Sequence, residues 1–204
     1  MWQQVADGMR AASALEFASL ACGVLYALLA VRRVRSCWLF GAASSLILIY
    51  LSWVARLPMQ AALQLCYVAM AVYGFWHWSR SRQADAVQLS RWPLRRYAAA
   101  LAALALLTLL LSPLVAAQVA AAWPRLDTLT MFAGLLATWM TARAQLENWL
   151  YWIAIDLLSV YLYAAQGLVF IAVLYAVYTA IAVAGWFAWR SQWLRQQRIA
   201  AAAR

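Results

Sequence analysis

The sequence contains no lysine, only one histidine and only six acidic residues in a chain of 204 residues. Charged residues make up 11% of the chain and hydrophobic residues 68%, whereas soluble domains average about 25% charged and about 45–50% apolar residues. This composition excludes an ordinary water-soluble domain. Enzyme motifs such as H-E-x-x-H, G-x-S-x-G and a glycine-rich phosphate loop are also missing, so the sequence does not predict an enzyme.

Cysteine is scarce as well. The three cysteines, Cys22, Cys37 and Cys66, have no Cys-x-x-Cys spacing and fall at or within apolar segments. We interpret them as small core residues, with neither a disulfide framework nor a metal site. No cofactor is predicted.

Long apolar runs dominate what is present. Most are 17 to 23 residues long and show no strand-like alternation, which excludes a β-barrel and favours helices that cross a hydrocarbon core about 30 Å thick. The sequence therefore predicts an all-α integral membrane protein with seven transmembrane helices. The expected spans are 14–31, 38–54, 59–79, 96–117, 126–142, 148–164 and 168–189.

The net charge of +10 comes from 16 arginines, which lie mainly between the spans. If the N-terminus is outside, 13 arginines are on the inside and 3 on the outside. The positive-inside rule then predicts an outside N-terminus, a cytoplasmic C-terminus and an odd number of spans. Residues 1–13 lack an apolar core that ends in a cleavage motif, so we expect no removable signal peptide there. Trp2, Val5 and Met9 could form an interfacial helix.

An internal repeat organises the chain. Residues 38–78 align without gaps on residues 149–189 at a constant offset of 111, which pairs tryptophan, tyrosine and glycine with the same residue types. Each repeat contains three spans, so one additional helix is needed to give both repeats the same orientation. We predict a 3+1+3 arrangement of parallel repeats, a pattern found in transporters. The expected segments are a leader at 1–13, repeats at 14–80 and 126–190, a basic loop with the linking helix at 81–125, and a basic tail at 191–204.

Asp156 is the acid nearest the middle of a span, where an ionisable group costs roughly 2.5–3.5 kcal/mol on insertion scales. Helical spacing places polar and aromatic residues on its face of the helix. Such a face could bind a cationic aromatic solute through stacking, cation–π contacts and a compensating charge. The alternative is that Asp156 is a structural carboxylate in a helix that begins in the aromatic belt. The residues on this face are Trp149, Trp152, Asp156, Ser159 and Tyr163.

A second polar stripe lies on the third helix of each repeat. Gln64 and Tyr175 are equivalent by the offset and lie near the middle of the membrane, where an amide could recognise hydroxyls or join neighbouring helices. Gly74 and Gly185 are expected to permit close helix packing. The candidate binding residues of this second group, including the first-repeat equivalents of Trp149 and Asp156, are Gln64, Tyr67, Tyr175, Tyr178, Trp38 and Ser45.

Two other ionisable residues have simpler interpretations. His77 stands beside Trp76 and Trp78 at the inner end of the third span, where we expect an interfacial side chain in preference to a proton relay. Glu147 precedes the sixth span, where an acid interacts favourably with the helix dipole.

The segment from Glu147 to Asp156, together with Tyr163 and the run 172–175, resembles the PnuC family of bacterial vitamin transporters. Leu63-Gln64, Tyr67 and the run 73–76 resemble the third helix of the same family. The resemblance covers about 14–190 and implies a SWEET-like fold, a homotrimer in the bacterial inner membrane, and uptake of nicotinamide riboside by facilitated diffusion. Phosphorylation inside the cell would trap the product. A glycine expected three residues after Tyr163 is replaced by Gln166, with Gly167 one place later.

The resemblance leaves substrates open, because relatives carry thiamine, riboflavin or deoxynucleosides. A non-transporting sensor or an enzyme subunit is the alternative from another class. The segment after Arg190 is short, basic and alanine-rich, so we expect no appended soluble domain, which argues against this alternative.

Overall fold

The computed structural model describes residues 13–80, 88–118 and 123–202, and within these ranges the chain forms seven α-helices and no β-strand. This confirms the predicted all-α architecture. The helices are α2 (Ala14–Val31), α3 (Cys37–Val54), α4 (Pro58–Ser79), α5 (Leu94–Gln118), α6 (Pro124–Ala142), α7 (Asn148–Ala165) and α8 (Val169–Ala202).

Local sequence signals explain where several helices begin. Ser13 and Glu16 form a capping box at the start of α2: the Glu16 amide donates to Ser13 Oγ at 3.3 Å, and the Ser13 amide donates to Glu16 Oε2 at 2.5 Å. Pro58 and Pro124 occupy the first positions of α4 and α6, where the missing N–H costs no helical hydrogen bond. The residues expected to form a separate tail after 190 instead continue α8 as far as Ala202.

Four of these helices, α2, α3, α5 and α8, are each long and apolar enough to span a membrane. The other three contain buried polar residues such as Gln64 in α4, Thr138 in α6 and Asp156 in α7, which lower their hydropathy. α6 is the most deeply packed helix of the bundle, because small residues line much of its length. The chain is a multi-pass membrane protein.

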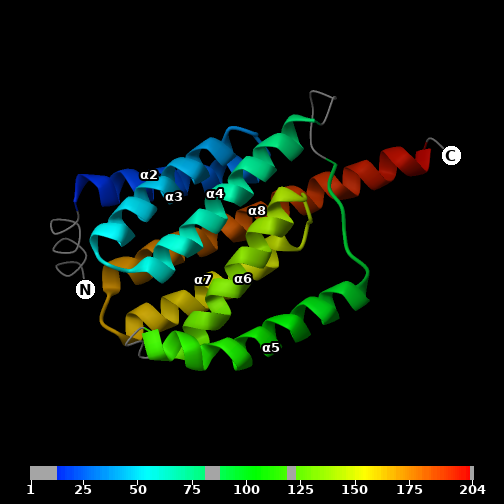
Figure 1. The fold of residues 1–204 in the computed structure, drawn as a ribbon. Helices are drawn as coiled ribbons and strands as arrows, with labels where there is room; N and C mark the ends of the chain where they lie inside the picture. Colours follow the sequence, from blue (N-terminus) through cyan, green and yellow to red (C-terminus); the bar gives the residue numbers. More distant parts are fainter. Residues whose placement is uncertain (1–12, 81–87, 119–122, 203–204) are drawn as a thin grey trace.

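Six helices close into a ring. The main packing contacts join α2 to α3, α3 to α4, α4 to α6, α6 to α7, α7 to α8, and α8 back to α2. The remaining helix, α5, packs mainly against α6 and lies outside this ring (Figure 1).

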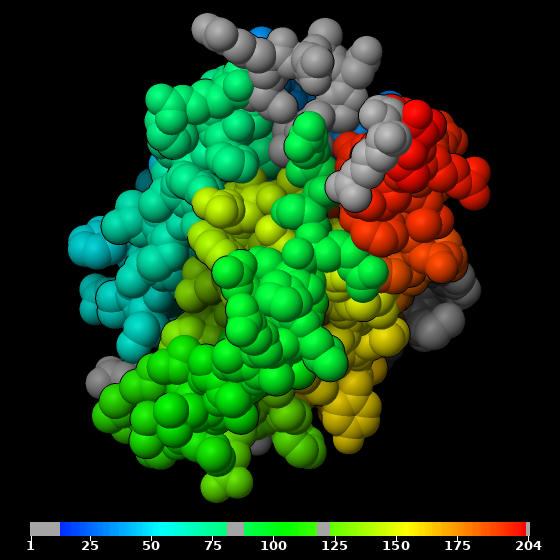
Figure 2. Space-filling model, turned by 90° about the vertical axis from the view of Figure 1, so that its right-hand side faces the viewer, coloured from blue at the N-terminus to red at the C-terminus, as the bar shows by residue number. Residues whose placement is uncertain are grey.

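The bundle has two distinct ends. We call the end that carries residues 32–36, 80, 88–93 and 143–147 the arginine-rich end. Eight described arginines lie in these segments or in the adjoining first turn of α5, and three more lie in the last turns of α8. The opposite end holds only Arg56 and Arg125 among the described residues. Figure 2 views the arginine-rich end, where the segment that leads into α5 (green) crosses the yellow-green α6–α7 region between α4 and α8.

The helix bounds repeat at the predicted offset. α3 and α7 begin and end 111 positions apart, and α4 and α8 begin 111 positions apart. The connecting turns repeat as well: Arg33 and Ala144 have φ values of 56° and 51°, and Arg56 and Gly167 have φ values of 57° and 74°. These correspondences support the predicted 3+1+3 arrangement and extend the repeat into the turn that follows each first helix. The predicted interfacial leader lies almost entirely outside the described residues.

Candidate functional site

A cavity of about 620 Å³ opens between α2, α3 and α8 at the end opposite the arginine-rich end. Glu16 and Ser19 of α2 line one wall of the cavity, and Ser44 of α3 lines it as well. Ser44 Oγ donates to the Ser19 carbonyl at 2.9 Å, which fixes α3 against α2. The wall from α8 contributes two phenols, Tyr175 and Tyr178. The cavity thus lies between the first predicted repeat and the third helix of the second.

The tyrosines continue from the cavity towards α7. Tyr175 stacks on Tyr163, with ring centroids 5.3 Å apart and planes only 9° from parallel, and it meets Tyr178 at 6.2 Å with planes tilted by 60°. The carboxylate of Asp156 interacts electrostatically with both Tyr175 and Tyr178. The structure therefore brings together four residues that the sequence predicted from two different helices.

Asp156 is only 4% exposed, and within the described residues it has neither a hydrogen-bond partner nor an ion-pair partner. A buried carboxylate without such partners carries a large desolvation cost. Asp156 is thus the least satisfied charged group in the described core. A ligand that offers a positive charge or hydrogen-bond donors would remove this cost.

The other predicted polar residues are buried in the bundle. Gln64 and Ser45 are each 7% exposed, and neither makes a hydrogen bond within the described residues. Ser159 Oγ instead donates to the Ile155 carbonyl at 2.9 Å, one turn back in its own helix. Gln64 and Ser45 therefore keep their hydrogen-bonding capacity, whereas Ser159 has already used its donor.

Tyr67 and Tyr178, which are equivalent in the repeat, each approach a glycine of the other repeat. A Cβ added at Gly134 would lie 2.7 Å from Tyr67 Oη, and one added at Gly23 would lie 2.6 Å from Tyr178 Oη. Gly23 and Gly134 are also 111 positions apart. Glycine is needed at both positions because any larger side chain would displace the phenol.

Trp38 and Trp149 belong to a different environment, a buried apolar cluster at the arginine-rich end. Each ring packs against a glycine: a Cβ on Gly74 would lie 2.4 Å from Trp38, and one on Gly185 would lie 2.6 Å from Trp149. The expected packing role of Gly74 and Gly185 is confirmed. Trp152 packs against this cluster, and its Nε1 donates to Thr141 Oγ1 at 3.4 Å.

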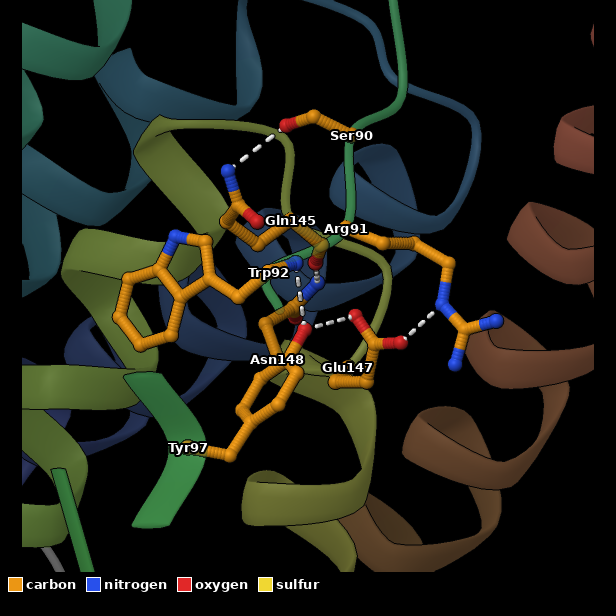
Figure 3. Close-up of polar contacts among 7 residues, drawn as sticks. All are labelled: Ser90, Arg91, Trp92, Tyr97, Gln145, Glu147 and Asn148. Carbon is orange, nitrogen blue, oxygen red and sulfur yellow. Dashed lines mark hydrogen bonds and ion pairs between the residues drawn. The ribbon is translucent and has the colours of Figure 1, made fainter. Parts of the chain in front are cut away.

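The loop between α6 and α7 is held by the segment that precedes α5, in a network that the sequence did not predict (Figure 3). The Ser90 amide donates to the Ala144 carbonyl at 3.1 Å, and the Leu146 amide donates to the Ser90 carbonyl at 3.0 Å. Gln145 Nε2 adds a bond of 2.7 Å to Ser90 Oγ. We call residues 88–93 the strap.

Glu147 stabilises the second half of the strap, at Arg91 and Trp92. Its carboxylate pairs with Arg91 and accepts a hydrogen bond of 2.5 Å from Tyr97 Oη, which itself accepts from the Trp92 amide at 2.9 Å (Figure 3). The role of Glu147 therefore extends beyond the expected interaction with the helix dipole. The sequence patterns also did not predict Glu16 and Ser19 as cavity residues, because the gap-free alignment of the repeats begins at residue 38, after the first helix. Ser44 was missed because it lies one position away from the predicted Ser45. The equivalence of Glu16 with Asp127 at the same offset was the available signal.

His77 lies at the arginine-rich end of α4, where its ring stacks on Tyr73 with centroids 5.7 Å apart. This contact fits the expected interfacial side chain. Among the described residues, no group of three or more histidine, cysteine, aspartate and glutamate side chains could hold a metal ion.

Comparison with known proteins matches residues 13–191 to the family model described as "Nicotinamide mononucleotide transporter". The chain is 30% identical over 182 residues to the riboflavin/roseoflavin transporter RibM of Streptomyces davaonensis, covering 86% of this chain and 83% of that protein. It is 28% identical over 153 residues to the nicotinamide riboside transporter PnuC of Escherichia coli, covering 62% of this chain and 64% of that protein.

The fold matches the crystal structure of the vitamin B3 transporter PnuC with a TM-score of 0.70 at 22% identity. The match covers 89% of this chain and 82% of that one. The family model spans most of the chain, and the two relatives and the shared fold agree with it. The chain belongs to the nicotinamide mononucleotide transporter family and is a vitamin transporter of the PnuC type.

Proposed function

We propose that this transporter carries a cationic aromatic vitamin of the nucleoside type, with nicotinamide riboside as the first candidate, by facilitated diffusion with alternating access. The observation that carries this proposal is Asp156, a carboxylate that is 4% exposed and has no cationic or hydrogen-bonding partner in the described part of the chain. A cationic solute would supply the missing charge. A neutral solute would have to leave the carboxylate uncompensated or donate hydrogen bonds to it.

The aromatic residues around Asp156 suit a flat, positively charged ring. Tyr163 and Tyr175 stack in parallel, and Tyr178 closes one edge of the pair. Cation–π contacts are worth about 2 kcal/mol when they are desolvated. In this proposal Trp152 and Trp149, one and two turns towards the arginine-rich end, contribute further aromatic surface when the protein changes conformation.

Riboflavin is the second candidate, and a specific observation favours it. The relative with higher identity and coverage is the riboflavin/roseoflavin transporter, at 30% over 86% of this chain. Riboflavin is a neutral and larger aromatic, and its ribityl hydroxyls could donate to Asp156 and pair with the amide of Gln64. The two candidates therefore differ in whether binding depends on the charge of Asp156.

The transport cycle and setting complete the proposal. The arginine distribution supports an N-terminus outside and a C-terminus in the cytoplasm of a bacterial inner membrane. In this proposed orientation the cavity lined by Glu16 faces the outside. Asp156 is the only acid within the central part of the described helices, which supports uniport without ion coupling. The family resemblance supports a homotrimer and trapping of the product by phosphorylation inside the cell.

The substrate is tested by titrating the purified protein with nicotinamide riboside, thiamine and riboflavin and following the fluorescence of its 13 tryptophans. Trp152→Ala should weaken binding of a cationic substrate such as nicotinamide riboside about tenfold or more, since a lost cation–π contact of about 2 kcal/mol exceeds the 1.4 kcal/mol that corresponds to tenfold. Trp53→Ala is the matched control because the Trp53 side chain is 72% exposed. Binding of none of these vitamins would refute the proposal.

Uniport is tested in proteoliposomes. Radiolabelled substrate should equilibrate across the membrane and not accumulate further when a proton or sodium gradient is imposed. Uphill accumulation of the unmodified substrate would contradict facilitated diffusion.

A further inference from the structure

Four tryptophans meet at the arginine-rich end in two equivalent pairs. Trp38 meets Trp78 with centroids 5.3 Å apart and planes at 82°, and Trp149 meets Trp189 at 5.4 Å and 90°. Trp78 and Trp189 then contact each other across the repeats at 6.4 Å. All four side chains are at most 4% exposed.

The two inner members of this group make reciprocal hydrogen bonds between the repeats. Trp78 Nε1, from α4, donates to the Ala142 carbonyl at the end of α6 at 3.0 Å. Trp189 Nε1, from α8, donates to the carbonyls of Ala30 and Val31 at the end of α2 at 3.3 and 3.1 Å. Val31 and Ala142 are 111 positions apart, as are Trp78 and Trp189.

These bonds use groups that are otherwise hard to satisfy. The last carbonyls of a helix have no partner within the helix, and a buried indole N–H needs an acceptor. Trp38 Nε1 and Trp149 Nε1, in contrast, have no acceptor although they are buried in the same cluster. The hydrogen bonds are therefore a specific property of Trp78 and Trp189 and do not follow from tryptophan packing alone.

The cluster lies at the end opposite the 620 Å³ cavity. Leu89 of the strap, only 7% exposed, belongs to the same apolar cluster. The structure is thus open at one end, between the repeats, and closed at the other by contacts that join each third helix to the first helix of the other repeat. Movement of the repeats relative to each other would have to break both indole bonds.

We propose that Trp78 and Trp189 are the gating residues of the transport cycle, and that their reciprocal indole–carbonyl bonds hold the arginine-rich end closed. This inference rests on the proposed alternating access. Both indole–carbonyl contacts lie in the same interface between the repeats. Opening this end to release the solute therefore requires the Trp78 and Trp189 bonds to break together. Trp38 and Trp149 pack in the same buried cluster, but they contribute no hydrogen bond that keeps this end closed.

Cys37 provides a natural reporter for the test. It is fully buried in the same cluster, whereas Cys22 is partly exposed and Cys66 is exposed. In a Cys22→Ser, Cys66→Ser background, the rate at which N-ethylmaleimide labels Cys37 should follow the fraction of molecules open at this end. The experiment uses ligand-free, monodisperse protein, so it does not depend on which vitamin is carried.

Trp78→Phe and Trp189→Phe should each raise the labelling rate about fivefold, and the double variant about 25-fold, because a factor of five corresponds to the roughly 1 kcal/mol of one hydrogen bond. Trp149→Phe loses the same indole volume next to Trp189 but no hydrogen bond, and it should change the rate less than twofold. Trp76→Phe, at a half-exposed site two residues before Trp78, should leave it unchanged.

Unchanged labelling in both Trp78→Phe and Trp189→Phe would overturn the gate, and so would an equal increase in Trp149→Phe. If either variant does not fold, the same assay on the protein with native Trp78 and Trp189 decides: nicotinamide riboside or riboflavin, whichever is transported, must alter Cys37 labelling if this end opens during transport. Absence of uptake in proteoliposomes would refute the proposed function separately, whatever the labelling shows.

Discussion

The two three-helix units share a backbone plan, but the loop that follows the first helix differs between them at the arginine-rich end. In the second unit, the α6–α7 loop is bound by the strap through Ser90 and through the pairing of Arg91 with Glu147. The equivalent α2–α3 loop carries Ser36 in place of Glu147. Duplicated halves can thus keep their helix packing while one loop acquires an ion pair and hydrogen bonds of its own.

The two units also differ in the polar side chains that they place inside the bundle. Asp156 in the second unit corresponds to Ser45 in the first, and Tyr175 corresponds to Gln64. The packing residues, in contrast, are the same in both, as Gly74 with Trp38 and Gly185 with Trp149 show. Packing positions and chemical positions of the repeat have therefore diverged to different extents.

The largest expected effect concerns the shared packing. Gly74→Ala and Gly185→Ala each place a methyl group within 2.6 Å of a rigid, buried indole, and overpacking of this kind costs typically 1–3 kcal/mol. We expect each substitution to lower the free energy of unfolding by about 2–3 kcal/mol, and to a similar extent, in denaturant titrations of detergent-solubilised protein. Gly41→Ala, whose nearest contact at 3.0 Å is with the Tyr26 ring, should cost less. Strongly unequal costs at positions 74 and 185 would show that the two units are packed differently.

The second effect concerns the strap, where the units differ. Arg91→Ala leaves the Glu147 carboxylate, which is 8% exposed, without its cation. Breaking a fully buried ion pair costs about 3–5 kcal/mol of stability. Because Arg91 is itself about half exposed, we expect Arg91→Ala to lower the free energy of unfolding by only about 2 kcal/mol. The same titrations measure it. Ser36→Ala, at the position equivalent to Glu147, should stay within about 0.5 kcal/mol of the parent protein. A cost for Ser36→Ala as large as that for Arg91→Ala would remove the distinction between the loops.

The third effect concerns the chemical difference inside the bundle. Asp156→Asn removes the compensating charge and should weaken binding of nicotinamide riboside about tenfold, which corresponds to about 1.4 kcal/mol. Ser45→Ala, at the equivalent position, should change the affinity less than twofold. Tryptophan-fluorescence titrations of monodisperse variants measure both. If riboflavin is the substrate, Asp156→Asn should have a much smaller effect, which would transfer the proposal to the second candidate.

The smallest effect concerns the turns at the end opposite the arginine-rich end. Arg56 has a φ of 57° and its equivalent Gly167 a φ of 74°, a conformation that costs residues with a Cβ roughly 1–2 kcal/mol. Arg56→Gly removes this cost, but glycine loses more conformational entropy on folding than arginine does. We therefore expect a net rise of about 1 kcal/mol in the free energy of unfolding. Gly167→Ala should lower it by a similar amount. Thermal unfolding of both variants checks this, and a shift in the same direction for both would contradict the proposed backbone equivalence.

Much of the fold follows from the sequence because hydropathy, arginine placement and the repeat act along the chain. The spans predicted at 38–54 and 148–164 agree with α3 and α7 to within one residue at either end. The strap could not be predicted in this way. Its ion pair joins residues 56 positions apart, and the segment 88–93 shows no hydropathy period. Contacts between distant loops depend on tertiary packing, which hydropathy does not encode.

The candidate site was predictable in part. Helical spacing placed Asp156 and Tyr163 on one face, and the offset added Tyr175 and Tyr178 from another helix. The same face contains Trp149, but two turns of helix separate it from Asp156, and its ring is buried against Gly185 at the arginine-rich end. A helical stripe gives the direction of side chains around the axis but does not say which neighbouring helix each one meets.

The exchange of indole bonds between the units has a consequence for how such a protein could originate. In this fold the tryptophan donor of each three-helix unit bonds a helix-end carbonyl of the other unit, as Trp78 and Trp189 show. Two copies of one such unit, placed side by side about a two-fold axis, would form both bonds at once. A gene duplication that joined the copies through α5 would keep this interface intact, and only afterwards could Ser45 and Asp156 become different from each other. The different residues now at these two positions would thus have evolved within an interface inherited from a symmetric ancestor.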